Sequence, residues 1–188
     1  SAGRPLSEIP WRLDEPRPAL PETIVIDSNA KDLSQQCRLL GIEYAFSALP
    51  SFIAVDVEND LVDAGITVFS NASSYRRAQG VPLIIPEINP QHYLESRHYC
   101  ATNCTLIPLA LPVAALANVV EVLSVQMRSE QALSGAGWEL LFDEEALAGR
   151  VNPFIDGEAE KTAAELLHVM GNLSNQSVSP AEMGIEVN

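Results

Sequence analysis

The sequence predicts an α/β protein with a largely parallel sheet. Short runs rich in β-branched residues alternate along the chain with longer segments of helical periodicity, the pattern of strands joined by helical crossovers. Hydrophobic residues make up 47% and charged residues 19% of the 188 residues, a balance that supports a globular core and excludes a disordered chain. In such sheets, binding groups collect at the carboxyl ends of the strands.

The first expected elements lie in the N-terminal third of the chain. Residues 1–23 are rich in proline and charge and are expected as an extended surface segment. Residues 23–27 and 42–49 read as strands, because each is a short run with β-branched or aromatic residues closed by a turn signal. Residues 51–64 carry apolar side chains at helical spacing, and Gly65 is a favourable residue just after a helix.

The remaining elements continue the alternation. Strands are expected at residues 66–70, 81–89, 98–101, 119–127 and 185–187. One helix is expected to begin near Asn103, and another to follow Asp156 and Gly157, with Leu166 on its inner face and Gly171 at its end.

Charge and cysteine content limit the classes of partner. Eleven basic residues against 25 acidic ones give a net charge of −14, which argues against a nucleic-acid or anionic membrane surface. The longest apolar run, residues 106–117, is too short to span a bilayer and contains two prolines. With three cysteines and no visible secretory leader, the expected compartment is the reducing cytoplasm.

Cys104 is the first candidate functional residue. A helix N-terminus carries a partial positive charge and unpaired N–H groups, which favour a thiolate and can bind an oxyanion. Cys104 occupies that position if the helix begins near Asn103, whose side chain is a good N-cap. The alternative is a small buried cysteine at the start of a core helix. Cys37 and Cys100 are interpreted as structural.

Seven motifs occur in a characteristic order. Those before Cys104 are SAGRPLSEIPWRL (1–13), SALPS (47–51), FSNASSYR (69–76) and VPLIIPEINPQH (81–92). Those around and after it are ATNCTLIPLALP (101–112), EQALSGAG (130–137) and VNPFIDGEAEK (151–161). Together they cover nearly the whole chain and resemble the aspartate-semialdehyde dehydrogenase family, in which an Asn-Cys-Ser/Thr motif holds the nucleophile.

The resemblance implies a fold and a reaction. Residues 1–103 are expected as an incomplete Rossmann-like nucleotide-binding domain, and residues 104–188 as part of an α+β catalytic and dimerisation domain. The implied reaction is the NADPH-dependent reductive dephosphorylation of aspartyl phosphate through a cysteine thioacyl intermediate, a step of aspartate-family amino-acid biosynthesis. The implied partners are aspartyl phosphate, aspartate semialdehyde, phosphate and further copies of the chain, associating through residues 119–127. No metal is implied.

The resemblance also assigns roles to site residues. It implies two catalytic residues, Cys104 as nucleophile and Gln131 as a contact of the substrate or the thioacyl group. It also implies four substrate-binding residues: Asn103 to orient the substrate, Arg76 to bind phosphate, Glu158 to bind the substrate ammonium, and Lys161 to bind its carboxylate or phosphate. From the residues alone, two blander interpretations stay open. Arg76 can be a solvated loop arginine, and Glu158 with Lys161 can be a surface ion pair.

The implied NADP site draws on three segments. Ser47, Ala48 and Leu49 fall where the family lines the nicotinamide side, and Ser1 falls near the adenosine 2′-phosphate region. Ser134, Gly135 and Gly137 belong to a turn whose glycines let the backbone approach the cofactor closely.

The sequence departs from the family pattern in two places. The Gly-x-x-Gly-x-x-Gly turn that receives the pyrophosphate is not found in these residues, and neither is the distal Gly-His that supplies an acid/base imidazole. His92, His98 and His168 are interpreted as packing or surface residues. The chain alone is therefore expected to turn over NADPH weakly or not at all. The alternative function is a truncated, inactive relative that acts as a binding or assembly subunit.

Overall fold

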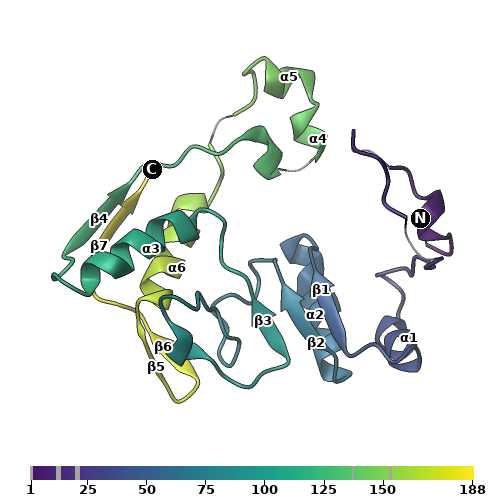
Figure 1. Ribbon diagram of the computed structural model, residues 1–188, viewed down its shortest axis with the longest axis horizontal. Coiled ribbons are helices and arrows are strands. Elements are labelled where there is room, and N and C mark those ends of the chain that lie inside the picture. Colours follow the sequence, from purple (N-terminus) through teal and green to yellow (C-terminus); the bar gives the residue numbers. More distant parts are fainter. Residues whose placement is uncertain (1, 12–13, 20–21, 137, 153) are drawn as a thin grey trace.

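The computed structural model describes residues 2–11, 14–19, 22–136, 138–152 and 154–188 (Figure 1). The helices are α1 (Leu33–Leu39), α2 (Ser51–Asp63), α3 (Leu106–Ala117), α4 (Trp138–Leu141), α5 (Glu144–Leu147) and α6 (Glu158–Val169). The strands are β1 (Tyr44–Ser47), β2 (Thr67–Ser70), β3 (His98–Cys100), β4 (Ser124–Met127), β5 (Asn172–Ser174), β6 (Ser177–Ser179) and β7 (Gly184–Val187). Short 3₁₀ turns are η1 (Leu6–Glu8), η2 (Pro90–His92) and η3 (Leu133–Ala136).

The strands β1, β2 and β3 form a parallel sheet in that order, with Phe46 opposite Phe69 and Phe69 opposite Tyr99. Helix α2 makes the crossover between β1 and β2 and ends as expected before Gly65, whose φ of +86° is the left-handed conformation that favours glycine. Leu61 of α2 and Val68 of β2 pack with Cys37 in one buried cluster. The predicted α/β class with a parallel sheet is confirmed.

The second half of the chain packs two helices beside small sheets. Figure 1 shows α3 and α6 close together, next to the parallel pair β4–β7 and above the hairpin β5–β6. Leu106 and Leu109 of α3 meet Leu166 and Val169 of α6 in the largest buried cluster. Leu83, Ile85 and Cys100 belong to the same cluster, so the core is continuous across residue 103. Among the described residues, no helix has the length and apolar character that a membrane span requires.

Four strand predictions were wrong in extent. The strand predicted at residues 42–49 is limited to β1, Tyr44–Ser47. Residues 23–27 form no strand; Ile24 makes a single antiparallel bridge to Pro5. Residues 81–89 also stay irregular, because only Leu83 bridges to Cys100 at the edge of the sheet. The strand predicted at 119–127 begins at Ser124, since the backbone N–H groups of residues 119 and 120 still bond to Leu116 and complete the end of α3.

Candidate active site

The turn between β3 and α3 carries Cys104. Its thiol is exposed, whereas Asn103 and Thr105 on either side are buried. Asn103 Oδ1 accepts a hydrogen bond from the Thr105 N–H at 3.2 Å, and the Asn103 carbonyl accepts from the Leu106 N–H at 3.0 Å. Helix α3 therefore begins at Leu106, slightly later than predicted, and Asn103 closes the turn before it. The Cys104 thiol points back to the Asn103 side-chain oxygen at 3.5 Å.

Glu158, the first residue of α6, accepts hydrogen bonds from three residues near the thiol. Its Oε1 accepts from Asn103 Nδ2 at 2.7 Å, from Thr105 Oγ1 at 2.8 Å and from Gln131 Nε2 at 3.0 Å. Gln131 Nε2 also donates to Thr105 Oγ1 at 2.9 Å. A side chain with acceptor oxygens suits this position, because several N–H and O–H groups converge on it at the N-terminus of the helix. Three motifs far apart in the sequence thus meet at one oxygen atom.

Arg76 is held behind the same turn by a second carboxylate of α6. Its Nη1 donates to Glu165 Oε1 at 2.8 Å, and its Nη2 donates to the Asn71 carbonyl at 3.0 Å. Glu165 Oε2 accepts from the Asn103 backbone N–H at 2.7 Å. The side chains of Arg76 and Glu165 are only 11% and 3% exposed, so Arg76 is not a solvated loop arginine.

Lys161 lies outside this network. Its side chain is exposed and, within the described parts of the chain, makes no hydrogen bond or ion pair. The surface ion pair between Glu158 and Lys161 that the spacing allowed is therefore absent from the described residues. Lys161 is one turn away from the Glu158 carboxylate that it was expected to accompany.

A hollow opens beside Cys104. Its lining includes Cys104, Gln131, Ser134 and Gly135, together with Pro108 of α3. A Cβ at Gly135 would lie 3.3 Å from Gln131 Oε1, so glycine allows Gln131 to approach the backbone of η3 closely. Four of the residues expected at the site therefore border one space.

A second hollow lies at the carboxyl ends of the parallel strands. Its lining includes Ser47 at the end of β1 and the residues that follow the three strands, Ala48 after β1, Asn71 after β2 and Ala101 after β3. The Ser47 hydroxyl is buried and has no hydrogen-bond partner among the described residues. This is the edge at which α/β sheets bind ligands.

Leu49, a further expected cofactor residue, is not part of these linings. Leu49 is half-buried just before α2 and does not line the strand-end hollow. Ser1 and Gly137 lie outside the described residues.

Sequence reasoning missed Thr105, Thr162 and Glu165 as site residues. Asn103 Nδ2 donates to Thr162 Oγ1 at 3.2 Å, so all three contact the turn that holds Cys104. A signal for two of them was present, because Glu158, Thr162 and Glu165 are spaced i, i+4 and i+7 and form one polar stripe on α6. Thr162 and Glu165 are both buried, which marks the stripe as facing inward.

The remaining cysteines and histidines are packing residues. Burial, with a further contribution from Glu58, raises the pKa of the Cys100 thiol to about 12, and burial also raises the pKa of Cys37. His98 contacts the buried Glu58 at 3.0 Å, and His92 is held between Asn89 and the Gly171 carbonyl. Burial lowers the pKa of His168 to about 4.

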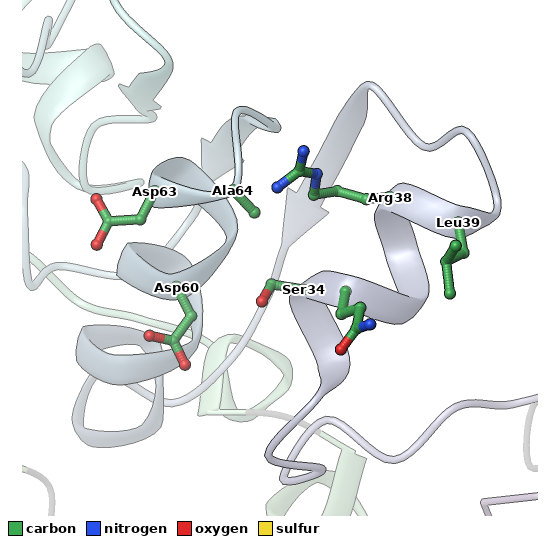
Figure 2. Close-up of a pocket in the computed structure, with 7 residues that line it drawn as sticks. Ser34, Arg38, Leu39, Asp60, Asp63 and Ala64 are labelled. Atoms are coloured by element: carbon green, nitrogen blue, oxygen red, sulfur yellow. The ribbon is translucent and has the colours of Figure 1, made fainter.

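Another hollow lies between α1 and α2, away from the predicted site residues (Figure 2). Its lining includes Arg38, Asp60 and Asp63. In Figure 2 the Arg38 guanidinium extends toward Ala64, whereas the two carboxylates point away from it. Because these charged groups do not point toward a common position, the hollow does not present a binding site for a charged ligand.

Comparison with known proteins identifies relatives. A sequence model described as "Semialdehyde dehydrogenase, NAD binding domain" matches residues 12–96. Aspartate-semialdehyde dehydrogenase of Archaeoglobus fulgidus is 38% identical over 154 residues, covering 76% of this chain and 44% of that protein. The enzyme of the same name from Methanothermobacter thermautotrophicus is 32% identical over 198 aligned positions, covering 98% of this chain and 55% of that protein.

A solved structure shows the same fold. The crystal structure of aspartate-semialdehyde dehydrogenase with NADP from Candida albicans matches 100% of this chain and 56% of its own chain, with a TM-score of 0.78 at 24% identity. The chain spans about half the length of the relatives it matches. Sequence matches on both sides of Cys104 and this shared fold agree, and the chain belongs to the aspartate-semialdehyde dehydrogenase family.

Proposed function

We propose that this chain carries the thiol site of an NADP-dependent aspartate-semialdehyde dehydrogenase. The observation that supports this most directly is the exposed Cys104 on a turn whose neighbours are fixed by Glu158 and Glu165. Because the residues on both sides of Cys104 are held in place and its thiol is exposed, the sulfur can reach a substrate carbonyl without a rearrangement of the turn.

In the first step, Cys104 Sγ forms a bond to the acyl carbon of aspartyl phosphate. The carbon–oxygen bond to phosphate breaks, phosphate leaves, and the thiol proton passes to solvent. The aspartyl group is then held as a thioester on Cys104, whose carbonyl accepts hydride more readily than a carboxylate does. After hydride and a proton are added, the carbon–sulfur bond breaks, and aspartate semialdehyde and the free thiol are released.

Arg76, Glu158 and Lys161 are proposed to bind the charged groups of the substrate. Arg76 uses two of its five N–H donors on Glu165 and Asn71, which leaves donors for phosphate. Glu158 Oε2 has no hydrogen-bond partner in the described ranges, so this oxygen is available to the substrate ammonium while Oε1 keeps the site together. Lys161, exposed one turn along α6, would neutralise the substrate carboxylate or phosphate.

NADP is proposed to lie at the strand-end hollow and to supply the hydride when it is bound as NADPH. The buried Ser47 hydroxyl, which has no hydrogen-bond partner among the residues that the structure describes, supports this assignment, because a polar ligand in the hollow would satisfy it. Ser47 and Ala48 would hold the nicotinamide side, and Ser134 with Gly135 would line its approach to Cys104.

Self-association is proposed through the surface next to β4. This surface carries three exposed apolar side chains: Val119, Val120 and Leu123 are 77%, 57% and 72% exposed. A group of exposed apolar side chains is typical of a surface that another protein covers. The functional protein is expected to be a cytoplasmic homo-oligomer. Its molar mass in solution, measured by light scattering, would test this.

The proposed function is tested by labelling the chain with an electrophilic aspartate analogue that carries a halomethyl ketone in place of the acyl phosphate. The rate constant of Cys104 with this analogue, divided by its rate constant with neutral iodoacetamide, gives a selectivity ratio. The ratio is expected to be about tenfold higher for Cys104 than for free cysteine, roughly the effect of one charge-assisted contact. Glu158→Gln should lower the ratio, and Glu160→Gln, an exposed carboxylate on the same helix, should not. A ratio equal to that of free cysteine would contradict the proposal.

A further inference from the structure

We propose that Glu165 is a positioning residue that fixes Arg76 against the Cys104 turn, so that anion binding beside the thiol depends on it. This inference rests on the proposed function, in which Arg76 receives phosphate. The motifs of the chain assigned no role to Glu165.

The two oxygens of Glu165 join two separate segments. Oε1 accepts from Arg76 Nη1 at 2.8 Å, and Oε2 accepts from the Asn103 N–H at 2.7 Å. Both partners are donors, so only a side chain with two acceptor oxygens satisfies them together. A glutamine of the same shape must turn its NH₂ group toward one of them. The Glu165 side chain is only 3% exposed, so water cannot take over the lost bond.

Arg76 makes one other hydrogen bond, and that bond alone cannot fix the orientation of its guanidinium group. Its Nη2 donates to the Asn71 carbonyl at 3.0 Å, and its Nε is buried without a partner in the described parts of the chain. The Asn71 carbonyl alone is a single contact about which the guanidinium can turn. The Glu165 carboxylate adds the second contact, and with it the plane of the guanidinium is fixed.

A different role for Glu165 makes the opposite prediction. If its negative charge only offset the charge of Arg76, removing it would strengthen anion binding. If it positions Arg76, removing one of its two acceptors releases the guanidinium or the Asn103 turn, and anion binding weakens. The sign of the change therefore separates the two roles.

The experiment measures how inorganic phosphate protects Cys104 from neutral iodoacetamide in the full chain. Glu165→Gln is expected to raise the half-protecting phosphate concentration about tenfold, the effect of one charge-assisted hydrogen bond. Glu165→Asp keeps two acceptor oxygens on a shorter stem and is expected to give a smaller rise. Glu160→Gln makes the same chemical change at an exposed position of α6 and is expected to leave the concentration unchanged. A concentration that falls or stays the same in Glu165→Gln would overturn the proposal.

The same experiment distinguishes failure of the Glu165 proposal from failure of the proposed function. If phosphate fails to protect the unaltered chain, Arg76 is not a phosphate ligand and the proposed function loses that residue. Glu165 is then judged by the alkylation rate without phosphate, because its Oε2 bonds the residue before Cys104. Glu165→Gln should change that rate at least about threefold relative to Glu160→Gln, as expected for residues in one hydrogen-bonded network. Equal rates in two folded variants would overturn the positioning role.

Discussion

Cys100 and Cys104 are close in sequence and differ in almost every physical respect. Cys100 ends β3, is 6% exposed and packs in the largest buried cluster. Cys104 lies on the following turn and is exposed, while Asn103 and Thr105 beside it are buried and hydrogen-bonded. The chain thus leaves the sheet within a few residues and keeps its polar neighbours fixed, so that an exposed thiol sits on a rigid turn.

The largest expected difference between the two cysteines is their rate of alkylation. With a pKa of about 12, Cys100 is almost entirely protonated at pH 8. It is expected to react with iodoacetamide about a thousandfold more slowly than free cysteine, because the thiolate is the nucleophile. Its rate should rise with pH up to about 12. Peptide mapping by mass spectrometry gives both rates in one sample; Cys100 reacting as fast as Cys104 in the folded chain would remove the contrast.

The buried polar group formed by Glu58, Ser70 and His98 is expected to be important for stability. Glu58 is fully buried and accepts from Ser70 Oγ at 2.7 Å while contacting His98 Nε2 at 3.0 Å. Glu58→Ala removes the acceptor of the buried Ser70 hydroxyl, which keeps only the bond that it accepts from the Ala72 N–H, and it removes the carboxylate that His98 Nε2 contacts. The substitution should lower the free energy of unfolding by about 3–5 kcal/mol. Asp60→Ala on the exposed side of α2 is the control and should change it by less than about 0.5 kcal/mol. Similar urea midpoints for the two variants would contradict this assignment.

The polar network beside Cys104 is expected to contribute less. Thr105→Val keeps the shape but removes the hydroxyl that donates to Glu158 and accepts from Gln131, at a cost of about 1–2 kcal/mol. Thr102→Val is the matched control, since Thr102 is buried and makes no side-chain hydrogen bond to the described residues. Thermal unfolding of both variants measures the difference, and equal melting temperatures would show that the hydroxyl is dispensable.

The smallest effect is a pH dependence carried by Cys100. Its folded pKa of about 12 lies above the ordinary thiol value of 9.0, so its contribution to stability is complete below pH 9 and is lost as pH rises toward 12. Relative to Cys100→Ala, the unaltered chain should lose about 1 kcal/mol of unfolding free energy by pH 10. Parallel pH profiles for the two proteins would show that the thiol proton is not retained in the folded state.

The sequence predicted elements well where local signals were strong. The helix closed by Gly65 and the strand after it appear with nearly the expected bounds, and the strand before it is present but shorter than expected. Residues 23–27 have strand character, but within the described parts of the chain their backbone pairing with residues 3–6 amounts to one bridge, from Ile24 to Pro5, which is too short for a strand. The hairpin β5–β6 was missed because its turn uses Asn175 and Gln176 at positive φ, where glycine is the usual signal.

The site was predictable as motifs but not as a network. Asn103, Gln131 and Glu158 were identified through the family resemblance, and they meet at one carboxylate oxygen. Thr105 acts through long-range hydrogen bonds to Glu158 and Gln131, which no local pattern encodes. Glu165 belongs to the polar stripe of α6, but that spacing does not reveal its partners Arg76 and Asn103. Spacing alone also favoured an ion pair between Glu158 and Lys161, whereas Glu158 bonds to three polar neighbours instead.

The most direct test of the account is acylation of the chain by aspartyl phosphate generated in situ, without added NADPH. Thioester formation at Cys104 needs no hydride, so the account predicts a covalent aspartyl adduct on Cys104, matched by released phosphate and removed by hydroxylamine. Cys104→Ser should show neither adduct nor phosphate release. Absence of the adduct from the folded chain, or its appearance on Cys37 instead, would contradict Cys104 as the nucleophile.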